Sequence, residues 1–263
     1  MVHPSGTSPF DLSGTVAIVT GGNGGIGLGM ASGLVRAGAS VVISGRDPDK
    51  LERAKTELCS ETPGAKVHAV AADVTERSQV DVMVENTVAT FGRVDVLVAN
   101  AGINIRKAPQ DYTPDEWHRI IETNLTAPFL CAQAVYPHMK RQGGGKIITI
   151  GSMASILGLP FAAPYASSKG GIVQLTRVLA VAWAKDNIQA NAILPGWIDT
   201  DLTRGARRDI DGLHDRVTGR TPAGRWGEPA DFGGIGVFLA SRASDFVTGT
   251  AIPVDGGYSI MGG

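Results

Sequence analysis

The chain has 263 residues, 43% of them apolar and 19% charged, with a formal net charge of −1 at pH 7. That length and apolar content suffice for the core of one large α/β domain, and the near-zero charge gives no reason to expect nucleic acid or an anionic membrane as a partner. Two cysteines and five scattered histidines provide neither a disulfide framework nor the spacing of a metal site, so we expect two buried thiols and no metal.

The N-terminal segment MVHPSGTSPF lacks the charged and apolar regions of a signal peptide. No apolar run approaches the roughly 18 residues that a membrane-spanning helix needs. We therefore expect a cytoplasmic protein with a mobile tail at residues 1–10 and a single domain over residues 11–263.

Seven short segments rich in β-branched residues alternate with longer amphipathic segments. This alternation is typical of βαβ units, in which parallel strands form a sheet with helices on both faces. The predicted strands span residues 15–20, 40–44, 66–73, 94–100, 146–151, 188–194 and 250–255. The predicted helices span about residues 25–37, 48–60, 75–91, 114–142, 163–186 and 228–241. The pattern predicts a doubly wound parallel sheet of about seven strands in an α/β domain.

Residues 196–227 contain no predicted strand or helix. A compact domain rarely keeps an irregular segment of this length unless the segment has a function. We predict that it forms a substrate lid, mobile at about residues 200–225, which becomes ordered when ligands bind.

The first predicted strand leads directly into a glycine-rich turn, TGGNGGIGLGM. Glycines permit a sharp turn and let a pyrophosphate approach the amides of a helix N-terminus, whose partial positive charge favours anions. Two spacings fit, since Gly22, Gly24 and Gly27 match GxGxxG whereas Gly21, Gly25 and Gly27 match TGxxxGxG. The position between a strand and a helix predicts dinucleotide binding by a Rossmann-type sheet.

A tyrosine and a lysine stand four residues apart in PYASSKGGIV. On a helix, Tyr165 and Lys169 share one face and only small residues separate them, although a lone pair of this kind is more often two neighbours on a surface helix. A lysine charge at ~4 Å could lower the pKa of a tyrosine by ~3 units, which would make the phenol an effective base near neutral pH. Ser152 ends an apolar strand thirteen residues before Tyr165, and its hydroxyl could stabilise charge on a substrate oxygen.

Six motifs occur in order along the chain: TGxxxGxG, NAG at 100–102, ETNL with Asn124, IGS with Ser152, YxxxK, and PGWIDT at 195–200. Together they resemble the short-chain dehydrogenase/reductase (SDR) family over nearly the whole chain. The resemblance implies an NAD(P)-dependent oxidoreductase that interconverts a secondary alcohol and a ketone by hydride transfer.

The resemblance also implies roles for individual residues. Tyr165 would be the general acid/base, assisted by Ser152 and by Lys169, which would also hold the nicotinamide ribose. Asn124, a poor residue for a helix interior, would bend its helix and hold a water in a proton relay to Lys169. The implied cofactor contacts are Gly21, Asn23, Gly25, Ile26, Gly27, Arg46, Asp73, Val74, Asn100, Ala101, Gly102, Tyr165, Lys169, Pro195, Gly196, Ile198 and Thr200. The expected substrate contacts are Ser152, Arg106 and Trp197.

The end of the second strand bears on the choice of cofactor. NAD-using relatives commonly carry an acidic residue there, whereas this chain has Gly45 followed by Arg46. An arginine can bind a 2′-phosphate through two hydrogen bonds. A second basic residue, often found in the glycine-rich loop of NADP-using relatives, is replaced by Gly24. The sequence thus favours NADP(H), with NAD(H) possible, and Asp47 is expected to begin the next helix.

Three functions stay open on this sequence. AGINIRKAP is similar to the gluconate and deoxygluconate dehydrogenases of the family, and basic residues there and in the lid could attract a sugar acid, although such residues are more often solvated. A 3-oxoacyl carrier-protein reductase is the alternative, but the positions at which those enzymes carry docking cations hold Gly143 and Asp186, with Lys140 and Arg141 nearby. A non-catalytic NADP sensor is disfavoured because the serine, tyrosine and lysine are all present. The family also implies a homotetramer with an interface formed by the helices at 114–142 and 163–186.

Overall fold

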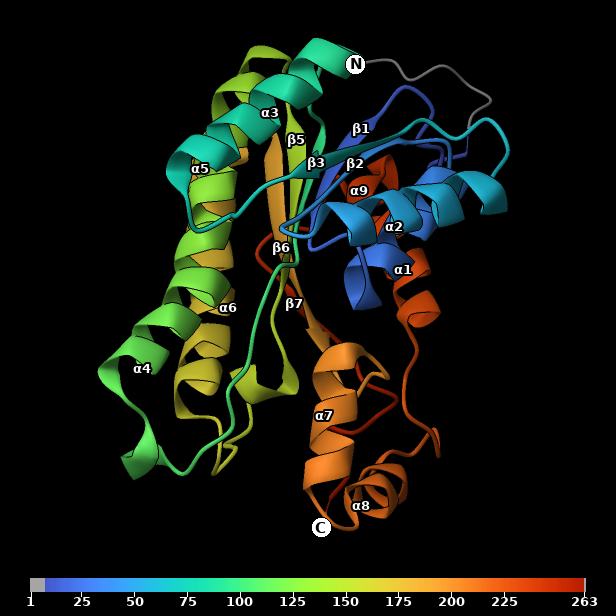
Figure 1. Cartoon of the computed structure of the whole chain (residues 1–263). Coiled ribbons are helices and arrows are strands. Elements are labelled where there is room, and N and C mark those ends of the chain that lie inside the picture. Colours follow the sequence, from blue (N-terminus) through green and yellow to red (C-terminus); the bar gives the residue numbers. More distant parts are fainter. Residues whose placement is uncertain (1–7, 263) are drawn as a thin grey trace.

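All seven predicted strands are present in the computed structural model, which describes residues 8–262. They form one parallel sheet in the order β3-β2-β1-β4-β5-β6-β7 (Figure 1). The chain reverses its direction of winding between β1 and β4, which in doubly wound sheets is where a ligand cleft opens. The strands are β1 (Val16–Thr20), β2 (Ser40–Gly45), β3 (Val67–Ala71), β4 (Val96–Ala99), β5 (Gly145–Ile150), β6 (Ile188–Pro195) and β7 (Ala251–Val254).

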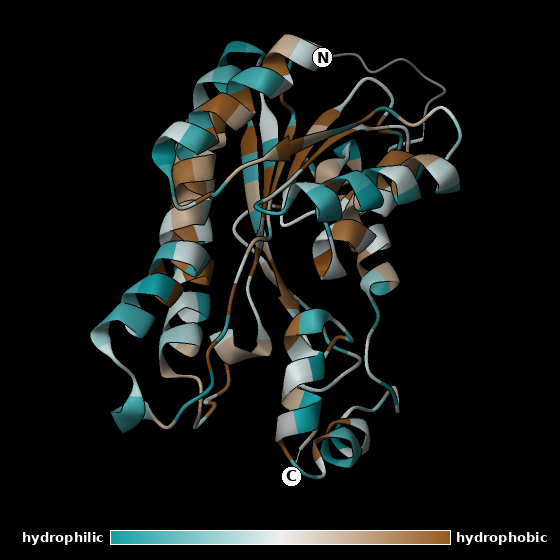
Figure 2. Ribbon diagram, viewed as in Figure 1, coloured by the Kyte–Doolittle hydropathy of each residue, from teal (hydrophilic) through white to brown (hydrophobic). Residues whose placement is uncertain are grey.

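Helices cover both faces of this sheet, as predicted. On one face lie α1 (Gly25–Arg36), α2 (Pro48–Glu61) and α9 (Gly233–Ala240), and on the other lie α3 (Arg77–Phe91), α5 (Ala127–Arg141) and α6 (Ala163–Trp183) (Figure 1). Successive strand residues point to opposite faces, so Val19 belongs to the first core cluster and Ile18 to the second. The strands are accordingly mostly hydrophobic and lie between helices that turn polar residues outward (Figure 2).

The predicted helix at 114–142 is not continuous. It consists of α4 (Pro114–Ile121), a π-helical turn (Glu122–Thr126) and α5. The side chain of Asn124 is buried within the π turn and bonds to the backbone of another segment. The bend that the resemblance implied at Asn124 thus takes the form of a π-helical turn within the helix.

The prediction that residues 196–227 are irregular is wrong. This segment contains α7 (Asp201–Asp209) and α8 (Leu213–Arg220), which lie beyond the carboxyl end of β6 (Figure 1). Both helices are short and strongly polar, but Ala206, Leu213 and Val217 are buried against Trp226 in a small cluster of their own. The segment predicted to be a lid thus has a packed structure that its polar composition concealed.

Smaller differences concern the ends of elements. Residues 184–186 and 229–232, predicted as parts of α-helices, form 3₁₀ turns, Ala184–Asp186 and Pro229–Phe232, and further 3₁₀ turns lie at Pro109–Asp111, Met153–Ser155 and Arg242–Ser244. Cys131 is buried as expected, but Cys59 is partly exposed because it lies on the outer side of α2. Residues 1–7 of the predicted tail lie outside the described residues. Within residues 8–262, no helix is long and apolar enough to cross a membrane.

Candidate active site

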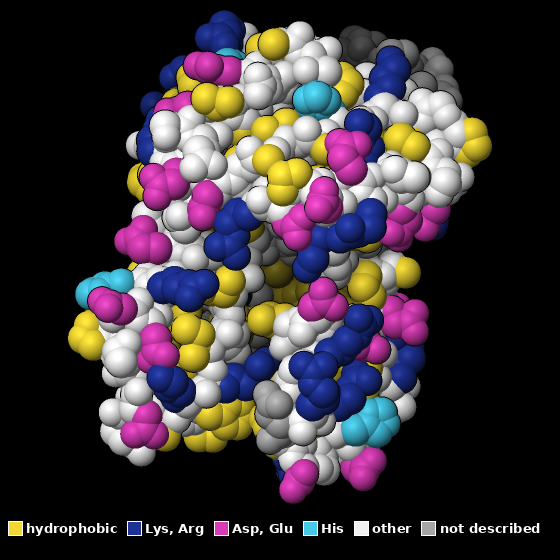
Figure 3. Space-filling model, viewed as in Figure 1, with side chains coloured by type: hydrophobic (Ala, Val, Ile, Leu, Met, Phe, Trp, Pro, Cys, Tyr) yellow, Lys and Arg dark blue, Asp and Glu magenta, His cyan; other side chains and the backbone are white. Residues whose placement is uncertain are grey.

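A cleft of about 580 Å³ opens at the carboxyl ends of β1, β4, β5 and β6. Through Asn23, Lys50 and Gly102 it continues into a second hollow of about 760 Å³ at the ends of β2 and β3. Figure 3 shows the molecule hollowed above α7 and α8, with Lys and Arg side chains around the opening. In the described part of the chain, no group of three or more His, Cys, Asp or Glu side chains could hold a metal ion.

The glycine-rich turn forms one wall of this cleft, and its conformation favours the TGxxxGxG spacing. Gly21 and Gly25 have positive φ angles of 63° and 53°. A Cβ at Gly27 would lie 2.3 Å from the carbonyl oxygen of Gly21, so only glycine fits there. At Gly24, by contrast, a Cβ would meet no described atom within 4 Å. The three required glycines bring the N-terminus of α1 against the cleft, where its backbone amides can bind a pyrophosphate.

Asn100 fastens this turn to the end of β4. Its Nδ2 donates to the carbonyl oxygens of Thr20 and Gly21 at 3.0 and 3.1 Å, and its backbone N–H donates to the hydroxyl of Thr20. The backbone N–H of Ala101 donates to the same hydroxyl. The asparagine therefore holds the two central strands in register where the winding reverses, as well as lining the cleft.

Ser152, Tyr165 and Lys169 line the cleft together, at the end of β5 and on the first turns of α6. Lys169 is buried, and its Nζ donates to the carbonyl oxygen of Ile150 at 2.7 Å while lying 5.7 Å from the centre of the Tyr165 ring. The Oγ of Ser152 accepts a hydrogen bond from the backbone N–H of Ala154 at 3.1 Å. The small residues between Tyr165 and Lys169 leave both side chains facing the same space.

The electrostatics of Tyr165 differ from the expectation. Burial raises the pKa of Tyr165 above its ordinary value, although its hydrogen bond with Ser152 and the positive charge of Arg106 act in the opposite direction. Burial also lowers the pKa of Lys169 to about 8. The expectation that Lys169 alone brings the tyrosine pKa down towards neutrality is therefore wrong for this structure, because desolvation of the phenolate outweighs the favourable interactions.

Asn124 and Lys169 both lie close to Gly102, since a Cβ at that glycine would be 3.3 Å from Oδ1 of Asn124 and 3.7 Å from Nζ of Lys169. Both polar atoms of the Asn124 side chain bond to Ile103, with Oδ1 accepting from its N–H at 2.8 Å and Nδ2 donating to its carbonyl oxygen at 2.9 Å. Nδ2 also lies 3.2 Å from the hydroxyl of Ser168. The asparagine thus links the π turn, the segment after β4 and α6, whereas its part in a proton relay stays a prediction.

The hollow at the ends of β2 and β3 contains the predicted adenosine residues. Arg46 is largely exposed, and its Nη1 lies 3.9 Å from Oδ2 of Asp73. Burial acts to raise the pKa of Asp73, but hydrogen bonds from Thr75 and the charge of Arg46 outweigh it, so this pKa lies below its ordinary value. Asp47 caps the N-terminus of α2 as expected. Asp73 is no helix cap, since α3 begins only at Arg77.

Most of the predicted cofactor residues line the two hollows. They are Gly21, Asn23, Gly25, Ile26, Arg46, Asp73, Val74, Asn100, Ala101, Gly102, Tyr165, Lys169, Pro195, Gly196, Ile198 and Thr200. Gly27 does not line either hollow, and its contribution is the close contact with the backbone of Gly21 that shapes the turn. The sequence reasoning missed Lys50 and Arg119, which also line the adenosine end. Lys50 could have been predicted from the sequence as a residue of this site. It lies in the first turn of α2, which follows β2 and therefore starts at the same edge of the sheet as the end of that strand.

The two side chains expected to contact substrate lie in different places. Arg106 reaches α7, where its Nη2 donates to the carbonyl oxygen of Leu202, a residue that lines the cleft. Trp197 is not brought to the cleft, because its ring packs edge-on against Trp226, with ring centres 5.5 Å apart. It lines a separate cavity together with Arg225 and other residues.

Comparisons with known proteins agree with this geometry. The family model described as Enoyl-(Acyl carrier protein) reductase matches residues 21–259. Gluconate 5-dehydrogenase of Gluconobacter oxydans is 39% identical over 260 residues, 99% of each chain. This chain belongs to the short-chain dehydrogenase/reductase family.

Two further relatives of this SDR are named as dehydrogenases of sugar acids. The 2-dehydro-3-deoxy-D-gluconate 5-dehydrogenase of Escherichia coli is 40% identical over 95% of this chain and 98% of its own. A crystal structure of a gluconate 5-dehydrogenase from Burkholderia cenocepacia, in complex with NADP and tartrate, is 41% identical, covers 96% of this chain and 98% of its own, and superposes with a TM-score of 0.88. The SDR described here is an oxidoreductase that acts on a CH–OH group with a nicotinamide cofactor.

Proposed function

We propose that this SDR interconverts a secondary alcohol of a sugar acid and the corresponding ketone, with NADP(H) as its favoured cofactor. The observation that carries the proposal is the meeting of Ser152, Tyr165 and Lys169 in the cleft that the glycine-rich turn opens. The gluconate and deoxygluconate enzymes, at about 40% identity, support the substrate class.

Residues such as Ile198 and Thr200 would hold a nicotinamide in this cleft, and the bound cofactor would supply or accept the hydride at the carbinol carbon. Tyr165 takes the proton of the substrate hydroxyl during oxidation and returns it to the carbonyl oxygen during reduction. Ser152 donates a hydrogen bond to the same oxygen, which stabilises the negative charge that develops there. Lys169 keeps a positive charge near the phenolate at neutral pH, since its pKa is about 8, and holds the nicotinamide ribose. Asn124 keeps the neighbouring backbone in place and holds the relay water.

The adenosine end of the cleft supports NADP(H). No carboxylate stands at Gly45, and the guanidinium of Arg46 is available, with 65% of its side chain exposed. Lys50 adds a second cation in the same hollow. Although Asp73 partly balances Arg46, a 2′-phosphate carries about two negative charges and can bind both cations. The basic residue missing at Gly24 is thus replaced by Lys50 from α2.

Arg106 is the proposed partner of the substrate carboxylate. Its guanidinium lies close enough to Tyr165 to lower the pKa of that phenol, and it already makes one contact to the lid segment. Docking of an acyl carrier protein is less well supported, because Nζ of Lys140 lies 3.4 Å from Asp186 and 3.3 Å from the hydroxyl of Tyr136. That local neutralisation weakens Lys140 as a docking cation for an acidic carrier and leaves only Arg141 of the two nearby cations without an acidic partner among the described residues.

The lid at about 196–227, a cytoplasmic location and a homotetramer stay predictions that accompany this proposal. The lid would now move as a pair of packed helices, α7 and α8, rather than as an irregular loop.

The test is a screen of gluconate-type acids, acyl ketones, cyclic ketones and steroids with both NADP(H) and NAD(H). We expect the highest kcat/KM for a sugar acid with NADP(H). Tyr165→Phe should lower kcat by roughly two to four orders of magnitude and leave the Kd of NADPH nearly unchanged, because the phenol acts on the reacting oxygen. NADPH binding without turnover of any compound would indicate a sensor, and a preference for acyl ketones would indicate the carrier-protein reductase.

A further inference from the structure

The lid helix α7 begins directly at the residues proposed for the nicotinamide end of the cleft. Ile198 and Thr200 line the cleft, and Asp199 stands between them. The backbone of Asp199 is fixed by a segment outside α7 and α8, since its N–H donates to the carbonyl oxygen of Gly227 at 2.8 Å. Asp199 thus follows β6 in a segment that is bonded to the backbone beyond α8, while its two neighbours line the cleft.

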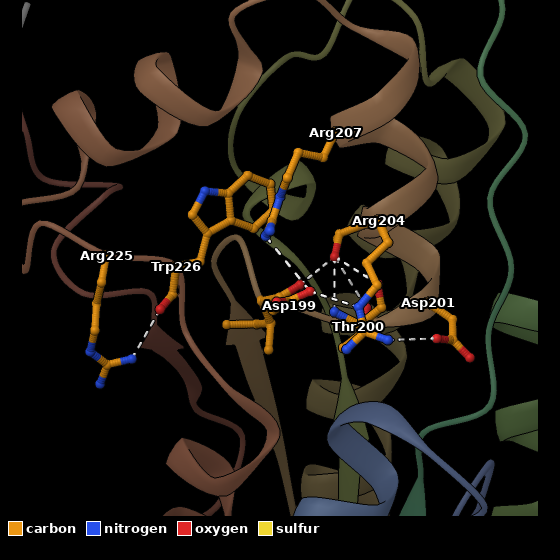
Figure 4. Close-up of polar contacts among 9 residues, drawn as sticks. Asp199, Thr200, Asp201, Arg204, Arg207, Arg225 and Trp226 are labelled. Atoms are coloured by element: carbon orange, nitrogen blue, oxygen red, sulfur yellow. Dashed lines mark hydrogen bonds and ion pairs between the residues drawn. The ribbon is translucent and has the colours of Figure 1, made fainter.

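That carboxylate binds α7 through two arginines. The Nε of Arg204 lies 3.0 Å from Oδ1 of Asp199, and Nη2 of Arg207 lies 3.7 Å from the same atom (Figure 4). The two arginines are three residues apart and so lie on one side of the helix. Arg204 also pairs with Asp201 at 3.2 Å, but Asp201 belongs to α7 itself and cannot attach the helix to the sheet.

Arg207 is held by a second contact. Its guanidinium stacks on the ring of Trp226 at 3.9 Å from the ring centre (Figure 4), a cation–π arrangement. Trp226 is only 7% exposed and packs with Ala206, Leu213 and Val217. Because Arg207 is partly buried, with its Nε enclosed and unpaired among the described atoms, its ion pair with Asp199 is less screened by water than an ordinary surface pair.

We propose that Asp199 is a positioning residue of the cofactor site. By holding Arg204 and Arg207 it fixes the first two turns of α7, and with them Thr200 and Leu202 over the cleft. This inference rests on the proposed role of Ile198 and Thr200 at the nicotinamide. Asp199 does not itself line the cleft, so it would act through the position in which it holds α7.

The first experiment measures the attachment of α7 without any ligand. Trypsin cleaves after Arg204 and Arg207 only when α7 opens, so the initial cleavage rate, with sites located by mass spectrometry, reports that opening. Asp199→Asn should be cleaved there at least about threefold faster than the wild type. Asp211→Asn removes the same charge from the exposed loop between α7 and α8 and should match the wild type. Equal rates for the two variants would overturn the inference.

The second experiment connects the attachment to the cofactor. We expect the Kd of NADPH, measured by its fluorescence without substrate, to rise about fivefold in Asp199→Asn, as for the loss of one partly buried ion pair. Asp199→Glu should restore most of the affinity, and Arg207→Gln should cost less when added to Asp199→Asn than in the wild type, since the Asp199–Arg207 ion pair is then already lost and only the stacking on Trp226 remains. An unchanged Kd in a variant whose α7 is cleaved faster would refute the link to the cofactor.

These outcomes are separate from those of the proposed function. If the wild type turned over no sugar acid, the proposed substrate would be wrong, while the cleavage rates and the NADPH affinities would still decide the part played by Asp199.

Discussion

Opposing effects act on the pKa of Tyr165, and burial is the largest of them. Burial raises its pKa, which would leave the phenol protonated and inactive as a base at neutral pH. Ser152 and Arg106 oppose that effect from two different segments. Arg106 therefore has two proposed tasks, binding the substrate carboxylate and favouring the phenolate.

The second task gives a pH prediction. In the oxidative direction kcat/KM should rise with pH as Tyr165 loses its proton. Arg106→Gln removes a positive charge that lowers this pKa, so the midpoint of the rise should move upwards, by roughly half a unit to one unit. Arg106→Lys keeps the charge and should keep the midpoint, even if the KM of the substrate increases. A midpoint that is the same in all three proteins would show that Arg106 does not influence the tyrosine.

At the scale of secondary-structure elements, the turn between β1 and α1 depends on contacts with the end of β4. Asn100, at the end of β4, and Gly21, in the turn, both contact the first turn of α1 closely. This is possible because Gly27 has no Cβ. The phosphate-binding wall of the cleft is thus built by two strands and a helix that are far apart in the sequence.

Gly27→Ala tests this construction. The new Cβ would lie 2.3 Å from the Gly21 carbonyl oxygen and 2.5 Å from Nδ2 of Asn100, so the turn must move and the amides at the helix N-terminus must leave their positions. We expect the Kd of NADPH to rise by at least about tenfold, with a lower Tm. Gly24→Ala introduces the same methyl group where no described atom lies within 4 Å, and its effect should be several-fold smaller. Similar losses in both variants would mean that the close approach at Gly27 is not critical.

Some secondary-structure elements could be predicted from the sequence, and others could not. The strands and the serine, tyrosine and lysine were predictable, because the carboxyl ends of parallel strands meet at one edge and the motifs lie at those ends. The resemblance implied a bend at Asn124, but not its form as a π turn, nor the two hydrogen bonds to Ile103, 21 residues away in the chain. The two lid helices were missed because their buried residues pack mainly on Trp226, and Trp197 turned towards the same ring rather than towards the cleft.

At the scale of the whole molecule, the outer side of α6 carries exposed apolar side chains. Val178 and Val181, three residues apart and so on one side of the helix, are 54% and 82% exposed, and Phe129 on the neighbouring α5 is 39% exposed. Contiguous apolar surface of this kind commonly marks a contact between proteins. It lies on the helices for which the homotetramer prediction requires an interface between identical surfaces.

The final prediction tests that assembly. In an interface between identical surfaces each residue of α6 is buried twice, so one substitution places two unfavourable groups in the same contact. Val181→Arg would bury two guanidinium groups where two valines should meet, replacing a gain of about 1.5–3 kcal/mol per valine by a desolvation cost. Light scattering should therefore give a tetramer for the wild type and a smaller species for Val181→Arg. Val82→Arg, at a valine 51% exposed on α3, introduces the same charge outside the predicted interface and should stay tetrameric. A monomeric wild type, or a tetramer that Val181→Arg leaves intact, would contradict an interface through α6.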